Sequence, residues 1–422
     1  MKERPKSVTC NGREYQYPKS PTVVVCIDGS EPGYIEAAID GGLAPNFARL
    51  MSDGPDGGAN LLAHSVIPSF TNPNNMSIIT GQPPQVHGIA GNYFFDPDTG
   101  KEVMMNSPEF LRAPTIMHAF HDAGARVAVV TAKDKLRGLL CKGIDFSSGR
   151  AVGFSSERAD QVSKEGNGIE DALTMVQMPL PDVYSADLSE FVMAAGVKLL
   201  EQFAPDLMYL STTDYIQHKA APGSEIANSF YAMMDRYVGA LDAAGASLVL
   251  TADHGMNDKY DKAREPDVIY LQELMDQWLG RGVEDGGARV ILPITDPYVV
   301  HHGALGSFAT IYMPDDTDLP AIADRLQSID GIELAATKAA ACDRFELPTD
   351  RIGDLVVVST RNKVLGTSAD RHDLSGLTEP LRSHGGTTEQ VVPMIANRKV
   401  NDVSQVQLRN FDVFDVALNR LS

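Results

Sequence analysis

Four short apolar runs constrain the fold of this chain more than any other feature, because each has strand length and lacks the alternation of a half-buried strand. They lie in the segments TVVVCIDG (22–29), RVAVVTAKDK (126–135), DLMYLSTTD (206–214) and SLVLTADHG (247–255). Helical patterns occur between them, at 45–54, 113–124, 188–203 and 229–245. This alternation predicts an α/β fold with a mainly parallel sheet sandwiched by helices.

The pattern changes between about residues 260 and 375. The segment 288–314 has the composition of strands, and 317–332 has that of a helix. We therefore predict a core formed by residues 1–260 and 375–422, with residues 261–374 inserted as an α+β cap.

Charge and composition limit the partners. The formal net charge is −20 and the pI is about 4.8, which disfavours nucleic acid and anionic membrane surfaces. An anionic substrate would need strong local positive charge, such as a metal ion. The sequence leaves the oligomeric state open, including a homodimer.

The cysteines and the apolar content predict a cellular location. Four cysteines are far apart in the sequence, at positions 10, 26, 141 and 342, and we expect free thiols in a reducing compartment. The N-terminus lacks an apolar core of the signal-peptide type, and no run of about 20 apolar residues occurs. We therefore expect a soluble, cytoplasmic protein.

Polar residues gather where the predicted strands end. Asp28, Asp214, Asp253 and His254 all follow apolar runs, and ligands of open α/β sheets collect at the carboxyl ends of strands. Taken alone, Asp28 in its Asp-Gly pair is also typical of a turn. The convergence of these residues indicates a site.

Two histidines extend this candidate site. His218 lies four residues after Asp214, so both would share one helix face and could chelate one ion. A helix-capping aspartate with a surface histidine is the alternative. His384 precedes two glycines and, taken alone, is more typical of a loop histidine. The pair His301 and His302 lies in the predicted cap, and we leave it outside the site.

A hydroxyl nucleophile is suggested by residues 64–94. Thr71 precedes Asn72-Pro73-Asn74, a turn that would expose its hydroxyl at a helix start, where backbone N–H groups favour an anion. Ser69 is a competing hydroxyl, and helix capping is the alternative role for both. The residues alone do not decide between them.

Together these motifs resemble the alkaline phosphatase superfamily, in its phosphodiesterase-like branch. The ordered elements are the strand-end Asp28, TNPNNMSIITGQPPQVHG (71–88), DYIQH (214–218), DHG (253–255) and HGG (384–386). The resemblance covers about residues 22–258 and 375–396, and it implies an alkaline phosphatase-like core.

The resemblance also implies two zinc ions and a nucleophile. One ion would be held by Asp214, His218 and His384, and the other by the set Asp28, Asp253 and His254. Thr71 would be the nucleophile, bound to the second ion, and its alignment favours it over Ser69. Two divalent ions bring +4 and three aspartates −3, so one positive charge is left to hold a threonine alkoxide.

Within the branch, PSFTNPNNMSIITG (68–81) and TAKDKLRGLL (131–140) most resemble members that hydrolyse the carbon–phosphorus bond of a carboxylated phosphonate. A carbanion leaving group needs its charge spread into that carboxylate, beside a cation. Lys133 and Lys135, two apart on extended backbone, would point to one side and bind this small-molecule substrate. Solvated loop lysines are the alternative.

One amide completes the predicted site. Asn92 would donate to a phosphoryl oxygen, as the resemblance implies, or would be a left-handed turn residue after Gly91.

Other functions remain open. A nucleotide pyrophosphatase or phosphodiesterase would share the metals and Thr71 but would want aromatic or apolar walls for a base. A mutase of the superfamily would use other metals and another insertion. A non-catalytic binding module would have lost ligands, whereas all six proposed ligands are present here.

Overall fold

The computed structural model describes residues 4–96, 98–294, 304–377, 379–403 and 407–422. A seven-stranded sheet forms its centre, in the order β4-β19-β10-β3-β9-β7-β8. The five strands β10, β3, β9, β7 and β8 pair in parallel, and β19 and β4 add an antiparallel edge. The α/β fold predicted from the sequence is confirmed. The strand bounds are β3 Thr22–Cys26, β4 Ala59–His64, β7 Val127–Thr131, β8 Ala151–Ser155, β9 Leu207–Ser211, β10 Ser247–Thr251 and β19 Val391–Ala396.

The parallel strands are buried along their whole length, as their apolar runs predict. Successive side chains alternate between two cores: Val23 and Val25 belong to one, while Val24 and Cys26 belong to the other. Helices cover both faces, which is why no polar alternation exists along these strands.

One core is covered by four main helices: α1 (Pro32–Asp40), α2 (Pro45–Leu50), α9 (Asp187–Gln202) and α11 (Glu225–Ala243). The other is covered by α3 (Thr71–Thr80), α5 (Ile116–Asp122), α6 (Asp134–Leu140) and α15 (Val413–Asp415). Three of these, α2, α5 and α11, begin or end several residues away from the helical patterns in the sequence.

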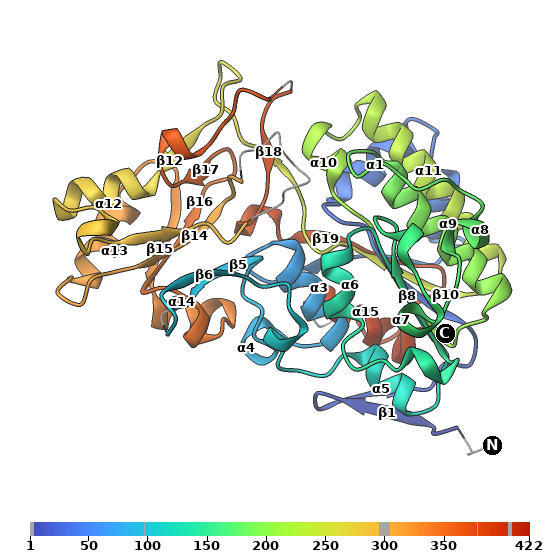
Figure 1. Cartoon of the computed structure of the whole chain (residues 1–422). Coiled ribbons are helices and arrows are strands. Elements are labelled where there is room, and N and C mark those ends of the chain that lie inside the picture. The colour runs from blue at the N-terminus through green and yellow to red at the C-terminus, as the bar shows by residue number, and fades with distance from the viewer. Residues whose placement is uncertain (1–3, 97, 295–303, 378, 404–406) are drawn as a thin grey trace.

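A second, antiparallel sheet lies to the side of the first in Figure 1. Its order is β13-β14-β16-β15, and three helices pack with it around a separate core. The bounds are β13 Arg289–Ile291, β14 Phe308–Tyr312, β15 Ile332–Thr337, β16 Leu355–Ser359, α12 Leu271–Leu279, α13 Leu319–Gln327 and α14 Lys338–Phe345. The division of the chain at residues 260 and 375 stays a prediction.

Smaller elements complete the chain. They are α4 (Pro84–His87), α7 (Lys164–Asn167), α8 (Ala172–Val176), α10 (Tyr215–Lys219), and the strand pairs β1 (Ser7–Cys10) with β2 (Arg13–Gln16), β5 (Tyr93–Asp96) with β6 (Lys101–Met104), β11 (Asn257–Asp258) with β18 (Arg382–Ser383), and β12 (Val268–Tyr270) with β17 (Val364–Gly366). In the described part of the chain, no helix combines the length and the apolar character that crossing a membrane requires.

Candidate active site and metal centre

Three neighbouring parallel strands deliver the three predicted aspartates to one edge of the sheet. Asp28 follows β3, Asp214 follows β9 and Asp253 follows β10, and β3 lies between the other two strands. Gly29 makes the approach possible: its φ is 71°, and a Cβ there would lie 2.9 Å from Cβ of Asp214. The loop after β3 therefore has to carry glycine at this position.

The first group of acidic and histidine side chains is Asp214, His218 and His384. Nε2 of His218 lies 3.0 Å from Oδ2 of Asp214, and Nε2 of His384 lies 3.6 Å from the same oxygen. Asp214 stands at the N-cap of α10 but its side chain makes no capping hydrogen bond. His218 and His384 are 1% and 3% exposed, so neither is a surface or open-loop histidine.

The second group is Asp28, Asp253 and His254. Nε2 of His254 lies 3.3 Å from Oδ1 of Asp28 and 3.8 Å from Oδ2 of Asp253. The two groups adjoin, because the rings of His254 and His384 stack with centroids 3.6 Å apart and an interplanar angle of 7°.

Backbone carbonyls fix the orientation of all three imidazoles. Nδ1 of His218, His254 and His384 donates to the carbonyl oxygens of Arg382, Gly255 and Ser69, at 2.9, 2.9 and 2.7 Å. A carbonyl oxygen can only accept, so the proton of each neutral ring sits on Nδ1. Nε2 then carries the lone pair, and it is the Nε2 atoms that face the carboxylates, as metal-binding histidines require.

The electrostatics of these groups suit cations. Burial, with the charges of Asp214 and Asp253, raises the pKa of Asp28 well above its usual value, and burial also raises the pKa of Asp253. Burial alone would raise the pKa of Asp214 too, but the positive charges of His218 and His384 when their rings are protonated, together with that of Lys133, outweigh burial and hold that pKa well below its usual value.

Two buried oxygens lack the partners that burial normally demands. Among the described residues, Oδ1 of Asp28 and Oδ1 of Asp214 accept no hydrogen bond. In each group, one ligand atom per residue lies within 4.8 Å of the others. Both groups can therefore hold a metal ion, since a cation would offset the buried negative charge and use these oxygens.

Thr71 and Ser69 differ in what their hydroxyls contact. Oγ of Ser69 donates to the carbonyl of Gly386 at 2.8 Å and accepts from N–H of Gly385 at 3.1 Å, and Ser69 is fully buried. Thr71 is the first residue of α3, and its Oγ1 lies 3.4 Å from Nε2 of His254. Ser69 thus holds the loop of His384, while Thr71 presents its hydroxyl at the second group.

Sequence reasoning missed Asn75. Its Nδ2 donates to Oδ2 of Asp253 and to the carbonyl of Thr71, both at 3.1 Å. Its Oδ1 accepts from the hydroxyls of Tyr209 and Ser211, at 2.8 and 3.0 Å. The i+4 spacing from Thr71 on a buried helix face is the signal that could have found it.

A pocket joins the remaining predicted residues to Thr71 and Asp28. Asn92, Lys133 and Lys135 line it together with Asn72, Thr131, Leu136 and Thr212. None of its described lining residues carries an aromatic ring. The pocket thus offers cations and amides beside the hydroxyl and the second group.

The lysines reach this pocket by a different backbone path from the predicted one. Only Lys133 is extended; α6 begins at Asp134, so Lys135 is helical and the expectation of extended backbone through both is wrong. At the start of this helix, N–H of Asp134 donates to Oε2 of Glu157 at 2.8 Å. Lys133 is 8% exposed, which differs from a solvated loop lysine.

Asn92 is held from two sides. Its Oδ1 accepts from N–H of Asn72 at 3.2 Å, and its backbone N–H donates to the carbonyl of Pro293 at 2.9 Å. Asn92 is absent from the residues with positive φ, so it is no left-handed turn residue. His301 and His302 lie outside the described residues.

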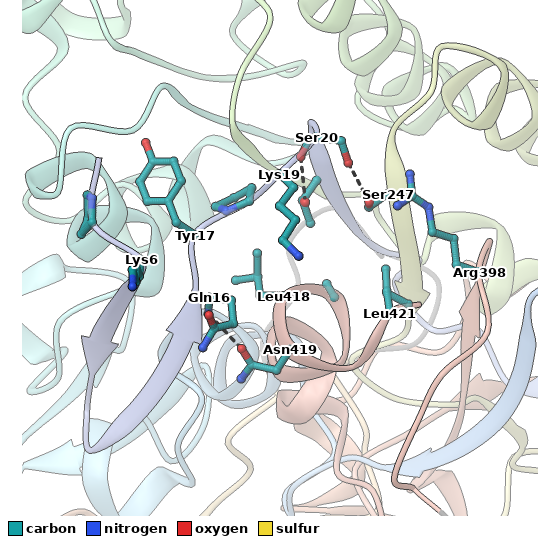
Figure 2. A pocket seen from close by; sticks show the side chains of 14 residues that line it. Lys6, Gln16, Tyr17, Lys19, Ser20, Ser247, Arg398, Leu418, Asn419 and Leu421 are labelled. Atoms are coloured by element: carbon teal, nitrogen blue, oxygen red, sulfur yellow. Dashed lines mark hydrogen bonds between the residues drawn. The ribbon is translucent and has the colours of Figure 1, made fainter. Parts of the chain in front are cut away.

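A second, more open pocket lies at the other end of the sheet, where β3 and β10 begin at Thr22 and Ser247. Figure 2 shows Lys19 extending into it between the N-terminal hairpin and the C-terminal turn with Leu418 and Asn419. The pocket contains none of the predicted site residues and no carboxylate among its described lining. The acidic and histidine groups place the candidate site at the carboxyl end instead.

Comparisons with known proteins agree with this geometry. Crystal structures of phosphonoacetate hydrolase from Sinorhizobium meliloti 1021, in complex with phosphonoformate and with phosphonoacetate, are 61% identical, cover 98% of both chains and superpose with a TM-score of 0.93. Murine ectonucleotide pyrophosphatase/phosphodiesterase 5 shares the fold at 17% identity, with a TM-score of 0.61 over 94% of this chain and 93% of that one.

Curated sequences match over shorter stretches. An uncharacterized pyrophosphatase/phosphodiesterase of Schizosaccharomyces pombe is 33% identical over 122 residues, which is 28% of this chain and 22% of the yeast protein. The profile of the type I phosphodiesterase / nucleotide pyrophosphatase family matches residues 22–387. The chain therefore belongs to the type I phosphodiesterase / nucleotide pyrophosphatase family.

Proposed function

We propose that this protein hydrolyses the carbon–phosphorus bond of phosphonoacetate to acetate and phosphate, with Thr71 as nucleophile. The observation that carries the proposal is the pocket that Thr71, Lys133 and Lys135 line together. The 61% identity with phosphonoacetate hydrolase of Sinorhizobium meliloti supports the choice of substrate. A carboxylated phosphonate carries negative charge at both ends, which matches cations at one wall and a metal centre at the other.

We further propose that both metal ions are zinc. Asp214, His218 and His384 would hold one, and the set Asp28, Asp253 and His254 the other. Imidazole nitrogens and carboxylate oxygens are common zinc ligands, and each group supplies three. When bound, the ions would neutralise the phosphonate and favour the ionised hydroxyl of Thr71.

The chain's own residues then perform the chemistry in two displacements. Oγ1 of Thr71 attacks phosphorus, and the P–C bond breaks with its electron pair on carbon. That charge spreads into the adjacent carboxylate, where Lys133 and Lys135 stabilise it. Thr71 gives its hydroxyl proton to water, and a proton from water adds to the carbon and releases acetate. Water then attacks the phosphothreonine and releases phosphate, which restores the hydroxyl.

Other side chains hold the reacting groups in place. Asn92 donates to a phosphoryl oxygen through Nδ2, since its Oδ1 is already held by N–H of Asn72. Asn75 keeps Asp253 and the first turn of α3 in register.

Residues 261–374 form the proposed cap beside this pocket. The four cysteines are free and buried, which supports a reducing compartment such as the cytoplasm.

Phosphate release decides between this proposal and a nucleotide phosphodiesterase. Zinc-loaded protein would be assayed on phosphonoacetate and on the p-nitrophenyl ester of thymidine 5′-monophosphate, with a chelator and with Thr71→Ala as controls. Chelator-sensitive turnover of phosphonoacetate that disappears in Thr71→Ala is expected. Turnover of the diester alone would refute the substrate assignment and keep the metal centre. The pocket's lack of an aromatic wall argues against a base-binding site.

A further inference from the structure

A buried ion pair that the mechanism above does not use links the two loops that follow the stacked histidines of the candidate metal centre. Lys259 lies five residues after His254, and Glu389 lies five residues after His384. Both side chains are 0% exposed, and Nζ of Lys259 donates to Oε1 of Glu389 at 2.9 Å.

Glu389 bonds to both histidine loops at once. Its backbone carbonyl accepts from N–H of Gly255, next to His254, at 2.7 Å. Its Oε2 accepts from N–H of Gly386, two residues after His384, at 2.9 Å. Glu389 thus links the two loops directly.

The carboxylate itself is fully occupied. Besides Lys259, Oε1 accepts from Nδ2 of Asn257 and from the hydroxyl of Thr388, both at 2.6 Å. Lys259 donates a second bond to the carbonyl of Arg361 at 2.6 Å. A buried pair with this many partners adds little net stability, because desolvation of both charges opposes it, but it restricts the backbone to one arrangement.

The backbone also connects the two loops through β11 and β18, which pair Asn257 with Ser383 and Asp258 with Arg382, and N–H of Lys259 donates to the carbonyl of Leu381 at 2.8 Å. These contacts form one short ladder. Beyond it, the chain from Gly255 to Glu389 includes the whole second sheet. A small shift of either loop would separate His254 from His384 and change the spacing of the two ligand groups.

We propose that Glu389, with Lys259 as its counter-charge, is a positioning residue that sets the spacing of the two metal sites. The proposal rests on the metal centre proposed above. The ion pair changes the metal affinity of the two sites and the geometry of the reaction, in addition to any effect on folding. Residues outside the ligand set commonly change metal affinity or activity by about 10- to 100-fold.

The test is zinc binding by the double variant Lys259→Met/Glu389→Gln, which leaves no unpaired charge in the interior. Zinc affinity is measured by competition with a chromophoric chelator, beside thermal unfolding and kcat and KM on phosphonoacetate. We expect cooperative unfolding to persist, zinc affinity at one or both sites to fall about 10- to 100-fold, and kcat to fall more than KM rises. A lower Tm with unchanged zinc affinity and kcat would overturn the proposal.

Two further variants keep the test decisive. Asp235→Asn is the matched control: Asp235 is 2% exposed and its carboxylate binds N–H of Phe47 and Nδ2 of Asn46, away from both loops. It should lower Tm and leave zinc affinity unchanged; an equal loss of zinc affinity would overturn the proposal.

If the double variant does not fold, Thr388→Val removes one donor and keeps both charges. A severalfold loss of zinc affinity is expected from it, and an unchanged affinity would overturn the role of Glu389. A wild-type chain that binds no zinc would refute the metal centre itself, which separates the two failures.

Discussion

Replacing Lys133 by methionine tests the proposed substrate most directly. The change removes one charge and nearly keeps the side-chain volume. Lys133 is 8% exposed and lines the pocket that contains Thr71. Burial raises the pKa of Asp28, and the charge of Lys133 opposes part of that rise. The same charge helps to lower the pKa of Asp214. The ammonium group therefore acts on the metal centre as well as on the pocket.

The expected loss follows from this burial. Removing one preorganised donor to charge that develops in a transition state costs about 2.7 to 4 kcal/mol, or about 10²- to 10³-fold in rate. Little solvent screens Lys133, so the full range applies. We expect kcat/KM on phosphonoacetate to fall by about 10²- to 10³-fold, with most of the loss in kcat.

A second substrate and a metal assay isolate the cause. p-Nitrophenyl phosphate has a leaving group that needs no carboxylate, so Lys133→Met should change its kcat/KM less than about tenfold. Zinc content should not fall, because the substitution removes a positive charge close to Asp28 and Asp214. Lys164→Met, whose Nζ donates to the carbonyl of Gly168 outside the pocket, is the matched control.

Two results would refute the reasoning. Full kcat/KM of Lys133→Met on phosphonoacetate would remove the lysine from the carboxylate site. An equal loss on both substrates with intact zinc content would place its action at the phosphoryl group instead.

Three other perturbations follow from the contacts of the site. Thr71→Ala should abolish phosphate release while chelator competition still finds zinc bound, because each ligand group is complete without the hydroxyl. Asn75→Ala should lower kcat/KM about 10- to 100-fold through the lost donor to Asp253, with a fall in zinc affinity that Thr71→Ala does not share. Burial lowers the pKa of His87 to about 3, below its ordinary 6.5, so folding keeps this ring neutral and its contribution is lost as pH falls from 6.5 towards 3. Between pH 7 and 5, denaturant unfolding should therefore show wild type losing about 2 kcal/mol more in total than His87→Gln, with a slope that approaches about 1.4 kcal/mol per pH unit only near pH 5; equal losses would contradict this.

The sheet and the ligand groups could be predicted because their signals are local and repeated. A run such as Thr22–Cys26 is apolar at every position, and a parallel sheet explains that pattern. Once the strands are parallel, their carboxyl ends share one edge, so Asp28, Asp214 and Asp253 must converge. The resemblance to the alkaline phosphatase superfamily, carried by the ordered motifs, then implied how they group with histidines far along the chain.

Other features depend on partners that the local sequence does not reveal. Asn75 acts on Asp253, 178 residues away, and its own segment only resembles a polar helix. The helix that carries Lys135 begins at Asp134, whose N–H donates to Glu157, and no pattern near Lys133 indicates this distant partner. β19 was not predicted, since Pro393 is unusual in a strand with neighbours on both sides.

The net charge of −20 and a doubly anionic substrate are compatible because the positive charge is local. At the proposed reaction site, Lys133 and Lys135 bring positive charge to the pocket, and the two ligand groups can hold metal ions with their buried carboxylates. The negative charge of the rest of the protein repels anions before they reach these groups. At 0.1 M salt this repulsion is screened beyond about 10 Å. Affinity should therefore come from short-range contacts at both ends of the substrate. A ligand with only one charged end makes contacts at one wall of the pocket and lacks those at the other. This difference would allow a small pocket without aromatic walls to select a carboxylated phosphonate.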